Sequence, residues 1–233
     1  MTDVVELTLL RFGTVRGVGV PIAGYLLRLR DGRRILVDTG CAREALTDPE
    51  SHFVVASDDY VVGRLETLGL TPADIDTVIV SHFDPDHAGA NDEFPHAEFV
   101  VQRAQYDHAR ESGLFRYTWI RQHWDDPRLR YRLLDGDTEL APGLTLLESG
   151  GHVPGHQAVL LELLETGRIL LAGDAWMRDT DPDTRPMSPF DLDEPATRRS
   201  QRRLADLART HDVTLVIHNH DTAQWATLRE SYR

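Results

Sequence analysis

The sequence predicts an α+β fold in which two strand-rich halves form one domain over residues 1–233. Short runs of apolar and β-branched residues, bounded by turn residues, occur in both halves of the chain and are typical of strands. Segments with apolar residues at helical spacing lie between these runs or after them. A hydrophobic content of 41% and a charged content of 27% indicate one packed globular domain.

The first half opens with a predicted β-meander. Its strands cover Val4 to Phe12, Ile22 to Arg30 and Arg34 to Val37, with an Asp-Gly turn before the last one. The remaining elements of this half are a helix at Asp59 to Leu68, a short helical turn at Thr71-Pro72, strands at Thr77 to Val80 and Phe99 to Val101, and a helix at Gln102 to Arg110. The next stretch, Gly113 to Arg130, fits no clean period, and we interpret it as a lid-like insertion.

The second half repeats this pattern of strands and ends with a helix and a strand. We expect strands at Leu144 to Glu148, Ala158 to Leu164, Ile169 to Ala172 and Val213 to Ile217, and a helix at Pro195 to Thr210. The run from Asp179 to Glu194 is dense in Asp and Pro. It is too polar to pack against a core, so we predict a surface loop there.

Composition limits the classes of partner. With 38 Asp and Glu against 25 Lys and Arg, the formal net charge of −13 opposes binding to nucleic acid or to an anionic membrane. A single cysteine, Cys41, excludes an intrachain disulfide and a cysteine-based zinc framework, so any metal must bind to His and carboxylates. No signal peptide or apolar span of roughly 18 residues is recognisable. We therefore expect a cytoplasmic protein with a small-molecule substrate.

Four potential metal ligands follow the predicted strand Thr77 to Val80 within six residues: His82, Asp84, Asp86 and His87. In an extended segment, His82 and Asp84 project to the same side. A turn after Pro85 would direct the other two side chains toward a second ion. Imidazole and carboxylate together suit zinc, iron, manganese or cobalt. The alternative is a polar turn, which rarely needs two His and two Asp so spaced.

Three further candidate ligands stand at predicted strand ends. His152 lies in the glycine-rich turn Gly150 to Gln157, Asp174 follows a buried strand, and His220 closes the last strand. A carboxylate on such a rigid support could bridge two cations. His156 is interpreted as a hydrogen-bonding neighbour of the site rather than a ligand, Asp221 as an acceptor behind it, and His218 as structural. The remaining histidines are interpreted as solvated: His52, His96, His108, His123 and His211.

These motifs resemble the metallo-β-lactamase superfamily and, within it, the quorum-quenching N-acyl homoserine lactonases. Besides the His82 to His87 cluster, the matching stretches include Pro21 to Gly40, Val100 to Arg103, Gly151 to Gln157 and His220-Asp221. The resemblance implies an αβ/βα sandwich with two divalent metal ions, zinc being expected. One ion would bind to His82, Asp84 and His152, the other to Asp86, His87 and His220, with Asp174 bridging both. Asp38 matches a supporting position, or is simply a turn residue.

The chain departs from the family pattern at two positions. Asp84 stands where the family has His, which favours harder metals and leaves iron, manganese and cobalt open. An acidic residue there also resembles the di-iron flavodiiron proteins, which makes oxidoreductase chemistry a minor alternative. Met177 stands where the lactonases carry a Tyr that orients the substrate carbonyl. That task would then pass to the metal, to Trp176 or to a residue of the insertion.

The resemblance implies that a metal-bound hydroxide opens the lactone ring of an N-acyl homoserine lactone or a similar uncharged ester. Asp86 and Asp174 are the candidate catalytic residues, with Asp86 passing a proton to the leaving oxygen. The alternatives are a thioesterase of the glyoxalase II kind, a phosphotriesterase or arylesterase, and a non-catalytic binding protein. A homodimer is possible. Four side chains are candidates for acyl-chain contact or for ordinary packing: Phe83, Phe115, Trp119 and Met177.

Overall fold

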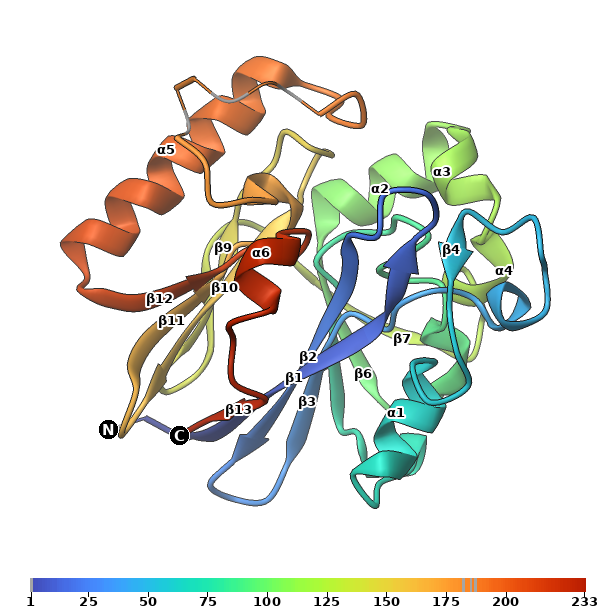
Figure 1. Ribbon diagram of the computed structural model, residues 1–233, viewed down its shortest axis with the longest axis horizontal. Helices are drawn as coiled ribbons and strands as arrows, with labels where there is room; N and C mark the ends of the chain where they lie inside the picture. Colours follow the sequence, from blue (N-terminus) through green and yellow to red (C-terminus); the bar gives the residue numbers. More distant parts are fainter. Residues whose placement is uncertain (1, 182, 185, 187) are drawn as a thin grey trace.

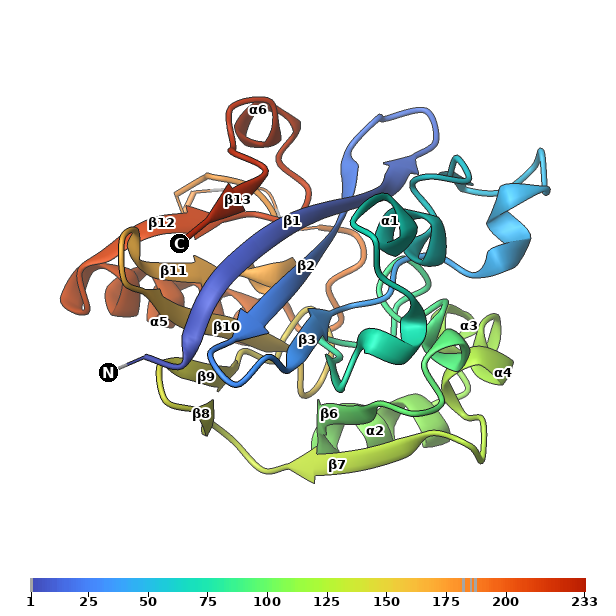
Figure 2. The same ribbon diagram turned by 90° about the horizontal axis from the view of Figure 1, so that it is seen from below.

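Two β-sheets lie face to face, and helices cover their outer sides (Figure 1). This computed structural model describes residues 2–181, 183–184, 186 and 188–233. Seen from the end that carries both chain termini, α5 lies outside one sheet and α1 to α4 lie outside the other (Figure 2). The arrangement confirms the predicted α+β class and the αβ/βα sandwich.

The larger sheet has the strand order β13-β1-β2-β3-β5-β6-β7, and β4 pairs with β1 off this path. Its strands are β1 (Val4–Val15), β2 (Pro21–Leu29), β3 (Arg34–Val37), β4 (Phe53–Val54), β5 (Thr77–Ile79), β6 (Glu98–Gln102), β7 (Arg130–Leu134) and β13 (Ser231–Tyr232). The first three strands form antiparallel hairpins, whereas β3, β5, β6 and β7 are parallel neighbours. The residues that follow β3 and β5 therefore emerge at the same edge of the sheet.

The smaller sheet has the order β12-β11-β10-β9-β8. Its strands are β8 (Thr138–Ala141), β9 (Leu144–Glu148), β10 (Gln157–Leu163), β11 (Gly167–Leu171) and β12 (Val213–Ile217). All pairs are antiparallel except β11 with β12, which run parallel. The β9–β10 connection and the ends of β11 and β12 consequently lie at one edge, and each leads to one of the later candidate ligands.

The helices are short apart from α5. Those described are α1 (Val61–Thr67), α2 (Arg103–Glu111), α3 (Phe115–Thr118), α4 (Arg121–Trp124), α5 (Glu194–Thr210) and α6 (Thr222–Trp225), with 3₁₀ turns η1 (Arg43–Leu46), η2 (Pro72–Asp74), η3 (Asn91–Glu93) and η4 (Gly173–Trp176). Asp193 caps α5 by accepting a hydrogen bond from the backbone N–H of Ala196 at 2.9 Å. None of the described helices is both long and apolar enough to cross a bilayer.

Three apolar clusters hold these layers together. Residues such as Leu27 and Leu161 fill the space between the sheets, and Leu204 of α5 packs against Leu170 on the outer face of the smaller sheet. A third cluster lies under α1 and α2 and includes Phe99 and Trp124. Alternating strand residues thus serve opposite faces of each sheet. Each fully buried side chain of this kind contributes on the order of 1.5–3 kcal/mol.

The sequence predicted most of the elements, whereas four strands were not expected. Strands β3, β9 and β12 have the predicted bounds, and most other predicted elements differ by one to three residues at an end. Strands β4, β7, β8 and β13 were not predicted. The stretch Gly113 to Arg130 contains α3 and α4, two helices of four residues each, which are too short to show a helical period.

Candidate metal centre

The ligand-rich segment leaves the sheet at the end of β5 and turns sharply. Backbone N–H groups of His87 and Ala88 donate to the carbonyl of Asp84 at 2.9 and 3.0 Å. Gly89 allows the turn to approach the chain after β3, since a Cβ atom there would lie 2.3 Å from the Ala42 nitrogen. The turn directs His82 and His87 toward different sets of side chains, as the spacing around Pro85 predicts.

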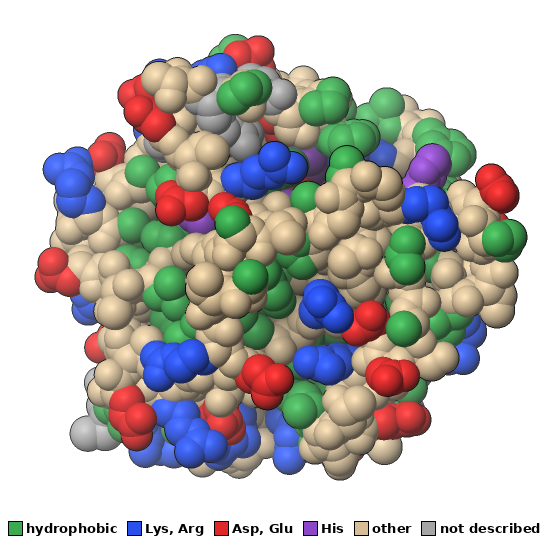
Figure 3. Space-filling view, viewed as in Figure 1, with side chains coloured by type: hydrophobic (Ala, Val, Ile, Leu, Met, Phe, Trp, Pro, Cys, Tyr) green, Lys and Arg blue, Asp and Glu red, His purple; other side chains and the backbone are tan. Residues whose placement is uncertain are grey.

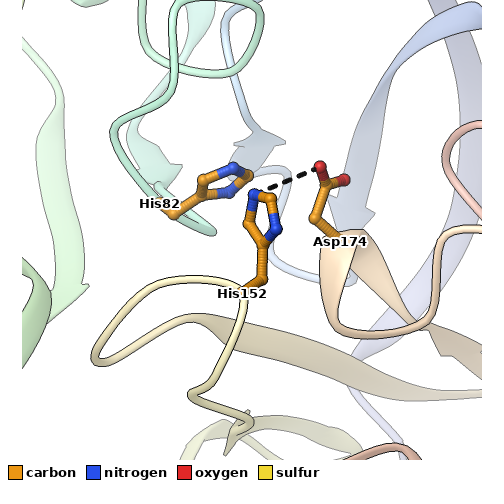
Figure 4. Close-up of side chains that lie close together, drawn as sticks. All are labelled: His82, His152 and Asp174. Atoms are coloured by element: carbon orange, nitrogen blue, oxygen red, sulfur yellow. Dashed lines mark ion pairs between the residues drawn. The ribbon is translucent and has the colours of Figure 1, made fainter. Parts of the chain in front are cut away.

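The first ligand group consists of His82, His152 and Asp174, which are all buried (Figure 4). One ligand atom of each lies within 4.8 Å of the other two. His82 comes from the segment after β5, His152 from the glycine turn between β9 and β10, and Asp174 from η4. The Nε2 atom of His152 lies 3.6 Å from Oδ2 of Asp174.

The second ligand group consists of Asp86, His87 and His220 and has the same 4.8 Å limit. Asp174 lies beside this group as well, because its Oδ1 atom is 3.5 Å from Nε2 of His87 and 3.2 Å from Nε2 of His220. One carboxylate therefore faces the first group with one oxygen and the second group with the other. This is the arrangement required of a bridging ligand.

Each histidine is oriented by a contact to its far nitrogen. Nδ1 of His87 lies 2.8 Å from Asp38, and Nδ1 of His220 lies 2.8 Å from the carbonyl of Pro21. Nδ1 of His152 lies 2.9 Å from Asp191, and Nδ1 of His82 lies 3.0 Å from the Ser81 hydroxyl. These contacts leave Nε2 of all four rings facing the ligand groups, which is how metal-binding histidines are commonly held.

Asp38 organises the turn as well as the histidine. It accepts hydrogen bonds from the backbone N–H and the hydroxyl of Ser81, both at 2.7 Å, and it is buried. Its φ of +59° lies in the left-handed region, which Asp tolerates better than most residues. Of the two interpretations of Asp38, support of the site agrees with these contacts.

Several ligand atoms lack any other partner. Within the part of the chain that the structure describes, Nε2 of His82, Nε2 of His87 and Oδ1 of Asp174 are buried and make no hydrogen bond. Buried polar atoms are otherwise nearly always paired. Burial opposes charge on His87, yet Asp174 and Asp86 raise the pKa of its imidazole well above the ordinary value. Lone pairs that converge in a negative environment fit a cation.

Asp84 is the candidate ligand that stands apart. Its Oδ2 atom lies 3.4 Å from Nε2 of His82 and 3.2 Å from Nε2 of His152. Both of its oxygens are also hydrogen bonded to the guanidinium of Arg116, with Nε donating to Oδ1 at 2.6 Å. Asp84 is thus close to the first group but engaged by a cationic side chain of α3.

Neighbouring polar residues mainly support the backbone. His156 accepts a hydrogen bond from the N–H of Asp174 at 3.0 Å, and burial lowers the pKa of its imidazole well below the ordinary value. This contact agrees with its interpretation as a hydrogen-bonding neighbour. Gly173 has a φ of +56°, and a Cβ atom there would lie 2.7 Å from Nε2 of His156. His218 contacts the carbonyl of Trp176 at 2.7 Å, and Asp221 caps α6 by accepting from the N–H of Gln224.

Two expectations about polar residues need correction. The run from Asp179 to Glu194 is a surface loop whose described residues are mostly exposed, as predicted. It is not too polar to pack, however, because the Asp191 side chain is only 1% exposed and contacts His152. The backbone N–H of Leu192 also donates to the carbonyl of His152 at 2.9 Å. Residues 182, 185 and 187 of this run lie outside the described residues. His123 is buried and lies 3.0 Å from Asp92 instead of being solvated.

Arg116 and Asp191 are the two site residues that sequence reasoning missed. Neither belongs to a spaced motif, and each reaches a ligand across more than 30 positions of sequence. The only available signals were the basic character of the insertion and the acidic character of the loop.

The sequence is similar to known proteins over most of its length. The metallo-beta-lactamase superfamily model matches residues 17–230. The N-acyl homoserine lactonase AttM of Rhizobium radiobacter is 31% identical over 228 residues, which cover 91% of this chain and 86% of the relative. An N-acyl homoserine lactonase of a Bacillus species is 32% identical over 221 residues, covering 88% and 83%.

A solved structure has the same fold. It is an N-acyl homoserine lactone hydrolase with the product N-hexanoyl-L-homoserine bound at its catalytic metal center, and it matches with a TM-score of 0.86 and 27% identity over 98% of both chains. The two-sheet sandwich, the paired candidate ligand groups and these relatives all indicate the same family. The chain belongs to the metallo-beta-lactamase superfamily and, within it, to the family of the N-acyl homoserine lactonases.

Proposed function

We propose that this protein is a metal-dependent hydrolase that opens the lactone ring of N-acyl homoserine lactones. The observation that carries the proposal is the position of Asp174 between two ligand groups, with one oxygen toward each. The lactonase relatives support the choice of substrate. The single cysteine, which is free and buried, favours a reducing cytoplasmic location.

We assign two divalent cations, zinc in the first instance, to these groups. His82 and His152 would hold one, while Asp86, His87 and His220 would hold the other. Asp174 would bridge them, and Asp84 would join the first only by releasing Arg116. The carboxylates keep iron, manganese and cobalt compatible with the site. Cations bound there would polarise a carbonyl group and lower the pKa of a water molecule toward neutrality.

Two carboxylates of the chain would then have separate roles. One would transfer a proton, and the other would hold the ligands in position. The Asp86 side chain is 15% exposed, so it can receive a proton inside the site and return it to the leaving oxygen. The Asp174 side chain is more deeply buried, and its proposed role is to hold the two ligand groups at a fixed distance from each other. We therefore assign proton transfer to Asp86 and positioning to Asp174.

Apolar side chains around Arg116 suit the acyl chain of such a substrate. Phe115 and Trp119 of the insertion are 71% and 37% exposed, and their rings stack with centroids 5.7 Å apart. Phe190, whose carbonyl accepts from Arg116, is 67% exposed. In Figure 3, histidine side chains are visible in the upper part of the face, close to basic and hydrophobic side chains. Phe83, by contrast, is fully buried in the core.

Met177, at the position of the family's carbonyl-orienting Tyr, has no side-chain hydrogen-bond donor that could replace the Tyr hydroxyl. The indole N–H of Trp176 donates to the carbonyl of Thr180 at 2.9 Å, so it is already engaged. Among the alternatives that the sequence left open, a donor from the insertion is therefore favoured over Trp176.

The test is a hydrolysis screen of the purified, metal-loaded protein. N-acyl homoserine lactones, thioesters and phosphotriesters are tested in parallel, and hydrolysis is monitored by the release of protons. We expect the lactones to be hydrolysed fastest. Turnover of thioesters or phosphotriesters alone would overturn the lactonase proposal. A folded protein that keeps fewer than about one metal ion per chain at neutral pH would indicate a non-catalytic binding protein.

A further inference from the structure

Arg116 lies at the first ligand group and joins three segments. Its side chain is 16% exposed and belongs to α3. The Nε and Nη2 atoms donate to the two oxygens of Asp84, and Nη1 donates to the carbonyl of Phe190 at 2.8 Å. Nη2 also lies 3.2 Å from Nε2 of His152. The guanidinium thus links the segment after β5, the glycine turn and the acidic loop.

These contacts use atoms that a cation would need. Nδ1 of His152 is engaged by Asp191, so Nε2 is the nitrogen that faces the first group. A hydrogen bond from Arg116 to Nε2 occupies the lone pair with which imidazole binds a metal. Each oxygen of Asp84 also accepts a hydrogen bond from the guanidinium, which uses one of its lone pairs. The guanidinium and a metal ion cannot both use the single lone pair of His152 Nε2, so the guanidinium must move before an ion binds there.

The positive charge of Arg116 also opposes metal binding at the first group. An arginine guanidinium stays positively charged in proteins, and this one lies beside Asp84 and His152. A permanent positive charge this close repels a divalent cation through a weakly screened, buried environment. Within the described residues, no Arg or Lys forms an ion pair with Asp86, His87 or His220, which pair only with one another, with Asp38 and with Asp174. The second group therefore carries no such competitor.

We propose that Arg116 is a resident cation of the first ligand group, and that a metal ion enters this group only by displacing the guanidinium from Asp84 and His152. The two groups then load unequally: the second binds its ion tightly, and the first binds an exchangeable one. The inference rests on the proposed metal-dependent function, although it does not depend on which ester is hydrolysed.

Metal binding, measured without any substrate, tests this inference. Metal-free protein is titrated with Zn²⁺ against a chromophoric chelator. We expect two steps whose affinities differ by at least about tenfold. In R116Q the weaker step should tighten by about tenfold or more, because a neutral side chain neither repels the ion nor holds Asp84 as strongly. The stronger step should stay unchanged.

Matched variants assign the effect. R121Q removes a cation from the same insertion, where Arg121 pairs with Asp125 and contacts no ligand, and it should titrate like the unaltered protein. H82A should abolish the weaker step, and H220A should abolish the stronger one. R116K keeps the charge but loses the two-pronged contact with Asp84, so its weaker step should tighten less than that of R116Q.

Several outcomes overturn the inference. Equal affinities in the unaltered protein would do so, as would an R116Q variant whose weaker step is unchanged. A weaker step that loosens in R116Q would mean that Arg116 supports Asp84 as a ligand. Circular dichroism checks the fold, and if R116Q is unfolded, tightening of the weaker step in R116K decides the question. The lactone assay is run separately, so unequal loading and lactone hydrolysis can fail independently.

Discussion

The two ligand groups share one carboxylate but differ in what supports them. The second group is backed by the larger sheet, through Asp38 after β3 and the carbonyl of Pro21 at the start of β2. In the first group only His82 has such backing, through Ser81 after β5, whereas His152 is backed by Asp191 of the acidic loop. Strand ends are held by hydrogen-bonded neighbours, whereas loops vary more freely. We conclude that differences among related chains would affect the first group more readily than the second.

The largest effect is expected at the residue that both groups share. Asp174→Asn keeps the shape of the side chain but removes its charge, so both groups should weaken. We expect fewer than about one ion per chain after dialysis and lactone hydrolysis lowered by about a hundredfold or more. Elemental analysis and initial rates measure this. Asp179→Asn, an exposed neighbour, is the control. Retention of two ions in Asp174→Asn would contradict the bridging assignment.

Thermal unfolding with excess Zn²⁺ separates the two groups. A ligand present at a hundred times its dissociation constant stabilises the folded state by about 2.7 kcal/mol. Because the first group is expected to bind more weakly, His220→Ala should lose more of the Zn²⁺-dependent rise in melting temperature than His82→Ala. The two variants are compared with and without chelator. Equal losses in melting temperature would contradict the proposal that the two groups bind Zn²⁺ with different affinities.

Asp38 and Asp191, the carboxylates that contact His87 and His152, should each affect metal binding by the group that they support. Asp38→Asn can keep the left-handed backbone conformation, since Asn also tolerates it, yet it loses the charge that faces His87. Partners of this kind typically change metal affinity by about ten- to a hundredfold. We expect the stronger step of the Zn²⁺ titration, which is assigned to the second group, to weaken in Asp38→Asn. The weaker step, which is assigned to the first group, should weaken in Asp191→Asn. An effect of Asp191→Asn on the second group would show that the groups are not independently supported.

The smallest effect concerns the insertion that carries Arg116. A hydrogen bond from His123 to Asp92 raises the pKa of the imidazole, although burial opposes this. The stabilisation is therefore complete below the ordinary pKa of about 6.5 and is lost as the pH rises through the higher folded-state value. His123→Asn should lower the urea midpoint more at pH 6 than at pH 9. A pH-independent difference would exclude the ion pair as its cause.

The candidate ligands that sequence reasoning proposed are those that can be recognised locally in the chain. The cluster from His82 to His87 follows a buried strand, and His152, Asp174 and His220 each follow a strand at the same edge. Strand ends can be recognised from hydrophobic runs and turn residues, so their ligands could be placed. The convergence of three separate segments on Asp174 came from the family resemblance.

The contacts of Asp84 could not be read from the sequence. Arg116 lies 32 residues away in a four-residue helix, and nothing in its local pattern marks it as a partner of Asp84. Asp191 is similarly hidden in a run whose composition favours solvent. Both partners are brought to the site by the tertiary fold, which short-range periodicity does not determine. The missed residues therefore belong mainly to the first group.

Gly173 gives the site an unexpected point of fragility. A residue without a side chain allows β11 to turn into η4 with its φ of +56°, next to the ring of His156. Substitution by alanine would leave every ligand in the sequence and still move the carboxylate that both ions are proposed to share. For anyone who engineers this scaffold, the position to leave untouched is thus one that no inventory of ligands contains.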